Sequence, residues 1–171
     1  MSATSLGIGE TTDNYETWMA SLGEVNRREL DAKHNLMAEA PFPFLRATFY
    51  DWALRYPACC REATDAPTVL GVGDLHVENY GLWRDAEGRL VWGVNDFDEA
   101  AQLPYSNDLV RLLTSAALAS KLDLRLAADA VLTGYRGGMV RGGRPFVLAE
   151  RHRSLHRLAL RQLTPTASGR S

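Results

Sequence analysis

The interpretation of the whole chain depends on residues 68–81, which read Thr68-Val-Leu-Gly-Val-Gly-Asp-Leu-His-Val-Glu-Asn-Tyr-Gly81. The first six are apolar, β-branched or glycine, which is typical of a buried strand. Asp74 follows directly, so its carboxylate emerges where the strand passes into a loop. Asn79 lies five positions further on, after that short loop. The stretch therefore brings an acid and an amide to one strand-to-loop junction.

The next stretch predicts a β-hairpin over residues 80–95, with its turn at Asp85-Ala-Glu-Gly88. Asp96 follows the second strand of this hairpin. Because a hairpin brings its two ends together, we expect Asn79 and Asp96 to be neighbours, with Asp74 beside them. The sequence thus predicts that three oxygen-bearing side chains converge within about 8 Å, close enough to share a metal ion and its waters.

Phosphoryl transfer needs such a grouping, because one carboxylate accepts the proton of the attacking hydroxyl while an amide and a second carboxylate bind magnesium. The order Asp-x-x-x-x-Asn, hairpin, Asp is similar to that of the protein-kinase-like superfamily. This resemblance implies that Asp74 is the catalytic aspartate and that Asn79 and Asp96 bind the metal, with Asp98 supporting them. Two other interpretations stay open: polar residues that cap turns, and a metal-dependent hydrolase that uses His76 with the acids.

The histidine of the loop points to one branch of that superfamily. Gly-Asp-Leu-His-x-x-Asn, residues 73–79, resembles the loop of aminoglycoside and choline phosphotransferases, with Val72 in place of their leading histidine. His76 is accordingly a second candidate catalytic residue. It either orients Asp74 or Asp96, or packs under the loop.

A closer resemblance covers residues 30–140. Four motifs are similar, in the same order, to those of the bacterial family called domain of unknown function 2252: Met37-Ala-Glu-Ala-Pro-Phe-Pro-Phe-Leu-Arg46, Gly73-Asp-Leu-His-Val-Glu-Asn-Tyr-Gly81, Asn95-Asp-Phe-Asp-Glu99 and Asn107-Asp-Leu-Val-Arg-Leu-Leu-Thr-Ser115. Ala40, Ala47 and Tyr80 depart from the family's serine, glycine and phenylalanine. None of these departures removes a candidate ligand.

The two resemblances imply the large catalytic lobe of a kinase-like fold, with magnesium and ATP or another nucleotide as cofactors. The chain has no glycine-rich loop followed by a lysine that would hold the nucleotide phosphates. We therefore expect a partial family domain whose nucleotide-binding lobe is missing, or is completed by a partner protein. Arg46 is the candidate phosphate-binding residue, and the alternative is a structural ion pair with Asp98 or Asp108.

Composition limits the other possibilities. The 171 residues contain 19 basic and 21 acidic side chains, a net charge of −2, which argues against binding nucleic acid through bulk charge. No apolar run is long enough to span a bilayer, and the N-terminus does not resemble a signal peptide, so we expect a cytoplasmic protein. The two cysteines, Cys59 and Cys60, are adjacent and do not form a disulfide framework.

Apolar periodicity predicts a helix-rich α+β protein with a small β element. We expect one domain over residues 14–163, between a disordered N-terminus (1–13) and a disordered tail (164–171). One helix is expected to start at a cap formed by Asn107 or Asp108 and to run to Ser120. Its apolar side is expected to face the core beneath the Asp74 loop: Leu109, Leu112, Leu113 and Ala116.

Three functions are compatible with these residues. The first is a magnesium-dependent phosphotransferase acting on a small-molecule hydroxyl, where the acidic rim suits a cationic acceptor. The second is a non-catalytic binding or regulatory module that keeps the lobe without the nucleotide machinery. The third is the metal-dependent hydrolase. None of the three involves nucleic acid or a membrane.

Overall fold

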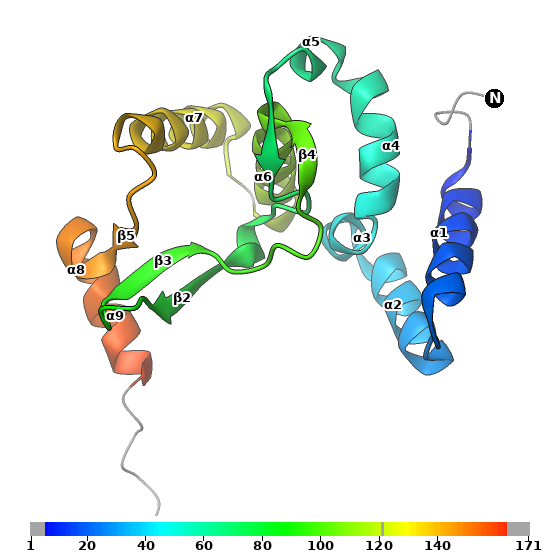
Figure 1. The fold of residues 1–171 in the computed structure, drawn as a ribbon, viewed down its shortest axis with the longest axis horizontal. Coiled ribbons are helices and arrows are strands. Elements are labelled where there is room, and N and C mark those ends of the chain that lie inside the picture. The colour runs from blue at the N-terminus through cyan, green and yellow to red at the C-terminus, as the bar shows by residue number, and fades with distance from the viewer. Residues whose placement is uncertain (1–5, 121, 164–171) are drawn as a thin grey trace, which may run out of the picture. The chain divides into compact units, whose positions relative to one another are not determined.

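A computed structural model describes residues 6–120 and 122–163 as helices and small antiparallel sheets (Figure 1). The predicted helix-rich α+β class is confirmed at that level. The described chain divides into two compact units, one built from residues up to 77 together with 97–134, the other from 78–96 together with residues from 135 onward. This division does not test the single domain over residues 14–163, which stays a prediction.

The two ends of the chain were expected to be disordered. Helix α1 begins at Ile8, inside the segment 1–13 that was expected to be disordered. The predicted disordered tail, residues 164–171, lies outside the described residues. Within the described ranges, no helix is both long and apolar enough to cross a bilayer.

The first unit consists of a helical layer and a two-stranded sheet. Strands β1 and β4 pair antiparallel, from Thr68 opposite Pro104 to Gly71 opposite Ala101, and β1 packs on helix α6 (Figure 1). The elements are α1 (Ile8–Leu22), α2 (Arg27–Glu39), α3 (Pro41–Ala47), α4 (Phe49–Cys59), α5 (Arg61–Thr64), β1 (Thr68–Gly71), β4 (Ala101–Pro104), α6 (Tyr105–Ala119) and the first part of α7 (Leu124–Val140).

Strand β1 is less buried than its composition predicts. Val69 and Leu70 are 40% and 73% exposed, so the prediction of a buried strand is wrong. The reason is that β1 has a single neighbour, β4, in a two-stranded sheet, so a helix covers one face and solvent can reach the other. β4 had no counterpart in the predicted elements.

The second unit is a three-stranded antiparallel sheet with two short helices. The predicted hairpin is confirmed: β2 (Tyr80–Arg84) pairs with β3 (Leu90–Val94), and Gly88 closes the turn with a positive φ of 76°. The 3₁₀ turn η2 (Val77–Asn79) leads into β2 from the first unit. β5 (Phe146–Val147) adds to β3, and α8 (Leu148–Arg151) and α9 (Arg153–Leu163) follow.

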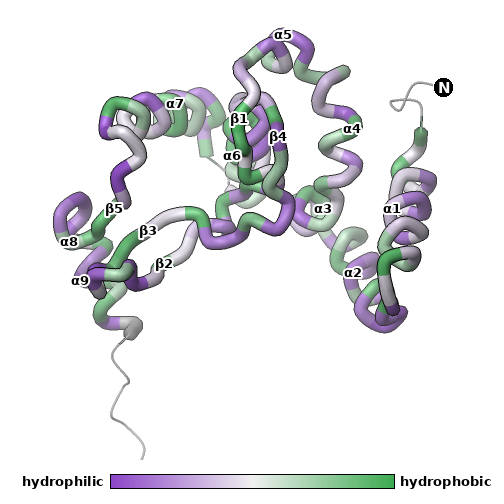
Figure 2. The backbone as a smooth tube through the Cα atoms, viewed as in Figure 1, coloured by the Kyte–Doolittle hydropathy of each residue, from purple (hydrophilic) through white to green (hydrophobic). Residues whose placement is uncertain are grey.

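A small hydrophobic core holds the second unit together. Leu90, Leu148 and Ala159 are buried in it, with Leu82 and Phe146 packed against them. Figure 2 shows β3 as green stretches of the tube on either side of a paler middle. Each of the three strands and both helices contributes a residue to this core, which explains why β5 and α8 attach to the hairpin.

Candidate functional site

The loop that carries Asp74 is tied to helix α6 by a neighbouring aspartate. The backbone N–H of Val72 donates to Oδ2 of Asp108 at 2.7 Å, and that of Gly73 donates to Oδ1 at 3.0 Å. One carboxylate thus accepts hydrogen bonds from two consecutive N–H groups, and its negative charge strengthens both bonds. Asp108 lies inside the first turn of α6, which begins at Tyr105. The predicted cap at Asn107 or Asp108 is therefore wrong, because both side chains serve the loop rather than the helix end.

Gly73 allows a second segment to approach the same loop. Its φ is +83°, and a Cβ built on it would lie 2.2 Å from the carbonyl oxygen of Glu99. No side chain can be accommodated at that distance, so glycine is required for both reasons. The close approach places the end of the predicted Asn95–Glu99 motif against the residue that precedes Asp74.

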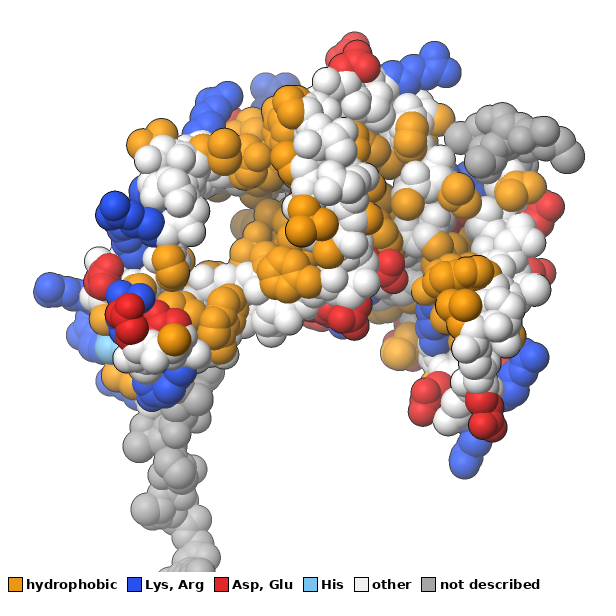
Figure 3. Space-filling view, viewed as in Figure 1, with side chains coloured by type: hydrophobic (Ala, Val, Ile, Leu, Met, Phe, Trp, Pro, Cys, Tyr) orange, Lys and Arg blue, Asp and Glu red, His pale blue; other side chains and the backbone are white. Residues whose placement is uncertain are grey.

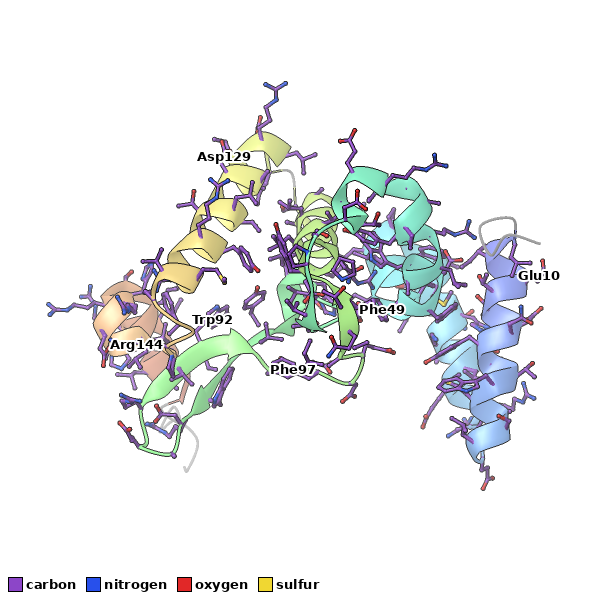
Figure 4. The ribbon with its side chains drawn as sticks, turned by 45° about the horizontal axis from the view of Figure 1, so that its top comes forward. Glu10, Phe49, Trp92, Phe97, Asp129 and Arg144 are labelled. Atoms are coloured by element: carbon purple, nitrogen blue, oxygen red, sulfur yellow. The ribbon has the colours of Figure 1, made fainter. Side chains whose placement is uncertain are left out.

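The Asp74 carboxylate is held by a buried arginine. Nε of Arg111 donates to Oδ1 of Asp74 at 2.8 Å, and Nη2 of Arg111 donates to the same oxygen. Nη2 also donates to the carbonyl oxygen of Leu45 at 2.7 Å. The guanidinium carbon lies 5.1 Å from the ring centroids of both Phe49 and Trp52, a distance at which cations are attracted to aromatic faces. Figure 4 labels Phe49.

Arg111 belongs to a polar stripe of α6, formed by Asn107, Arg111 and Ser115. These three residues follow at steps of four and are at most 1% exposed. Nε1 of Trp52 donates to Oδ1 of Asn107 at 2.9 Å, and the N–H of Val77 donates to Oγ of Ser115 at 3.1 Å. Nδ2 of Asn107 also donates to the carbonyl oxygen of Gly73 at 3.5 Å, so the stripe supplies partners to both ends of the loop.

The polar stripe corrects the predicted packing of α6. The leucines that were expected to face the core beneath the loop, Leu109, Leu112 and Leu113, are half-buried, as is Ala116. Polar residues occupy the face under the loop because backbone N–H groups of a buried loop need hydrogen-bond partners, which leucine cannot provide.

Burial disfavours both charges of the ion pair. Desolvation raises the pKa of the Asp74 carboxyl above its usual value, with Glu99 adding to the rise, while Arg111 and Arg46 oppose it. Burial likewise lowers the pKa of Arg111, and Asp74 opposes that shift. Nη1 of Arg111 is buried without a hydrogen-bond partner among the described residues, which is consistent with a costly desolvation. A carboxylate with a raised pKa is a stronger base than an ordinary one.

His76 is buried in the same unit. Its Nε2 lies 3.8 Å from Oδ2 of Asp74, beyond hydrogen-bonding distance, and its ring meets that of Phe42 edge-on at 6.1 Å. The histidine is therefore placed beside the predicted catalytic aspartate and packed against an aromatic ring. Its role as a catalytic residue stays a prediction.

Two more candidates belong to this unit. Arg46 and Asp98 are both exposed, Arg46 at the end of α3 and Asp98 in the segment before β4. Arg46 acts on Asp74 electrostatically and opposes the rise in the pKa of its carboxyl. Its predicted contact with phosphate and the predicted metal-supporting role of Asp98 stay predictions.

The remaining metal candidates, Asn79 and Asp96, stand at the open end of the hairpin in the second unit. The N–H of Asn95 donates to the carbonyl oxygen of Asn79 at 3.0 Å, just outside the pair Tyr80–Val94. This confirms that the hairpin brings the two stretches together. Asn79 is buried and Asp96 is exposed. Their convergence with Asp74, a residue of the first unit, stays a prediction.

Over the described ranges, no three or more histidine, cysteine, aspartate or glutamate side chains are gathered as a metal site. Amide oxygens such as that of Asn79 are a further class of metal ligand. Carboxylate and amide oxygens are the donors that magnesium prefers, so the predicted ligand types fit that ion.

Sequence interpretation assigned no role to Arg111 and considered Asp108 as a cap or an ion-pair partner. A sequence pattern could have revealed the roles of both residues. The helix with leucines on one side carries an amide, an acid, an arginine and a serine at positions 107, 108, 111 and 115. Polar residues repeating at four-residue steps indicate a helix face that binds something polar.

The loop, its buried arginine and the hairpin define a class of α+β protein with an acid-bearing strand-to-loop junction braced by a helix. Comparison with known families gives a match over residues 26–163 to the family described as an uncharacterized protein conserved in bacteria (DUF2252). The chain therefore belongs to this family, as its four motifs predicted. No curated protein and no solved structure matches the chain.

Proposed function

We propose that the protein is a kinase-like phosphotransferase that moves a nucleotide phosphoryl group to a small-molecule hydroxyl in a magnesium-dependent reaction. The observation that carries the proposal is the fixed position of the Asp74 carboxylate, which a buried arginine holds on a loop tied down by Asp108. Positioning supplies most of the rate in phosphoryl transfer, so a base held in this way suits the reaction.

In this proposal Asp74 accepts the proton of the attacking hydroxyl. Both hydrogen bonds from Arg111 go to Oδ1 of this carboxylate. The raised pKa of Asp74 favours proton uptake in the transition state. Asn79 and Asp96 would hold magnesium with hard oxygen donors, and the metal, when bound, would neutralise the charge of the nucleotide phosphates.

A second candidate is a module that binds ligands without transferring phosphate. The observation that favours it concerns the lysines, of which the chain has two, Lys33 and Lys121. Nζ of Lys33 lies 5.4 and 5.3 Å from the ring centroids of Tyr15 and Tyr50, so this side chain is engaged by aromatic rings. In this second candidate no lysine holds the nucleotide phosphates, so the chain would bind ligands with little or no ATP turnover.

Metal binding provides the first test. If magnesium binds to the folded state at Asn79 and Asp96, it should raise the melting temperature by linkage. We expect Asp96→Asn to lose most of this gain and Asp129→Asn to keep it. Asp129 is an exposed acid on α7, labelled in Figure 4, and is the matched control. An equal magnesium response in the wild type and both variants would contradict the proposed site.

A further inference from the structure

The second unit contains a cavity of about 500 Å³ that none of the candidate site residues line. It lies at the C-terminal end of α7, the turn that follows and the start of β5. Figure 3 shows basic side chains beside hydrophobic ones where α7 leads to β5, and Figure 4 labels Arg144 on that turn. Its wall includes Tyr135, Met139, Arg141, Arg144, Phe146 and Arg151.

The charge of this cavity is uncompensated. Arg141, Arg144 and Arg151 all line it, and no carboxylate among the described residues lies within ion-pairing distance of any of them. All three arginines are exposed to solvent, so their guanidinium groups are open to an anion. Guanidinium forks match phosphate oxygens in geometry, and each pairs with them through two parallel hydrogen bonds.

The backbone fixes this arrangement. Gly142 and Gly143 both have positive φ, 64° and 69°, which reverses the chain directly after α7. The N–H of Gly142 donates to the carbonyl oxygen of Met139 at 3.0 Å. β5 follows within three residues and pairs with β3, with Phe146 opposite Trp92. The cavity is therefore bounded by a helix end on one side and a sheet on the other.

The rest of the wall is apolar and partly aromatic. Tyr135, Met139 and Phe146 present surfaces on which a flat ring can pack, and arginine side chains also stack on such rings. A volume of about 500 Å³ lies within the usual range of small-molecule sites. The combination fits a ligand with a planar apolar body at one end and several negative charges at the other.

We propose that this cavity binds a nucleotide, with its phosphates on the three arginines and its base against the aromatic wall. The choice of a nucleotide rests on the proposed function, whereas the site itself rests on the charges and the wall.

The binding test uses the full chain and isothermal titration with ATP in the presence of EDTA, so that metal binding at Asp96 does not contribute. We expect ATP to bind, and Arg141→Gln/Arg144→Gln to weaken binding at least tenfold. Inorganic tripolyphosphate and adenosine should each bind at least tenfold more weakly than ATP. No binding of ATP by the wild type, or tripolyphosphate binding as tight as that of ATP, would overturn the assignment.

A steric pair of variants separates the cavity from general charge. Gly138 lines the cavity and Gly134 does not, yet both lie in α7 and a Cβ on either meets nothing within 4 Å. Leucine suits a helix better than glycine, so both variants should fold. We expect Gly138→Leu to weaken ATP binding at least tenfold and Gly134→Leu to leave it within twofold. Equal affinities would overturn the proposal.

The outcomes distinguish this inference from the proposed function. If ATP does not bind in EDTA but magnesium still stabilises the wild type and not Asp96→Asn, the nucleotide site is wrong and the catalytic proposal stands. If ATP binds as expected but Asp96→Asn responds to magnesium like the wild type, the cavity stands and the metal site is wrong.

Discussion

The ion pair between Asp74 and Arg111 can be tested with a double-mutant cycle of Asp74→Asn, Arg111→Met and both together. Arg111 is fully buried, while the Asp74 side chain is 21% exposed. The two single variants should therefore lose different amounts of stability. Asparagine keeps the shape of the acid but leaves a buried cation without its counter-charge, whereas methionine keeps the packing on Phe49 and Trp52 and leaves a carboxyl that can take up a proton.

The magnitudes follow from these environments. Removing one partner of a buried pair costs about 3–5 kcal/mol, and Asp74→Asn should cost about 3 kcal/mol because its amide oxygen still accepts a hydrogen bond. Arg111→Met should cost about 2–3 kcal/mol, mainly for the unpaired carbonyl of Leu45 and the lost ion pair. The double variant buries no charge, so we expect a loss of about 2–3 kcal/mol and a coupling of about 3 kcal/mol.

Urea denaturation followed by tryptophan fluorescence measures these values, with equal m-values as the check that one transition is compared. Arg89→Met is the control, because its pair with Asp85 is at the surface and should contribute little. If the losses of the single variants add up in the double variant, or if Asp74→Asn is as stable as the wild type, the buried pair does not hold the loop.

A further prediction concerns the same loop. Gly73→Ala should destabilise the protein far more than Gly88→Ala, which costs about 1–2 kcal/mol for positive φ alone, because only at Gly73 would a Cβ strike Glu99. Similar midpoints in urea for the two variants would refute the close approach.

The parts of the fold that local patterns determine were predictable. The hairpin at residues 80–94 follows from its turn residues and strand composition, and helix α6 follows from its periodicity. The burial of individual residues was harder to predict, because it depends on partners far along the chain. Leu70 belongs to an apolar run, yet it is largely exposed because its strand pairs only with β4, where its partner is Gln102, in a sheet of two strands.

The site was predicted in its residues more than in its contacts. Asp74, Asn79 and Asp96 were chosen from spacing and resemblance, which identify chemistry but not the groups that hold it. Arg111 lies 37 residues from Asp74, and no local pattern pairs the two. The general preference for leucine in a helix core favoured the wrong face of α6, since a loop with unpaired N–H groups needs polar partners more than apolar contact.

The polar stripe of α6 also restricts the positions in which the helix can pack against the loop. An apolar helix face can slide or rotate by one residue and exchange one leucine contact for another at small cost. A rotation of this kind in α6 would leave the guanidinium of Arg111, the indole N–H of Trp52 and the N–H of Val77 without acceptors at the same time. The helix can therefore pack in only one rotational position, and a structure with the loop one residue out of register is destabilised by several lost hydrogen bonds at once.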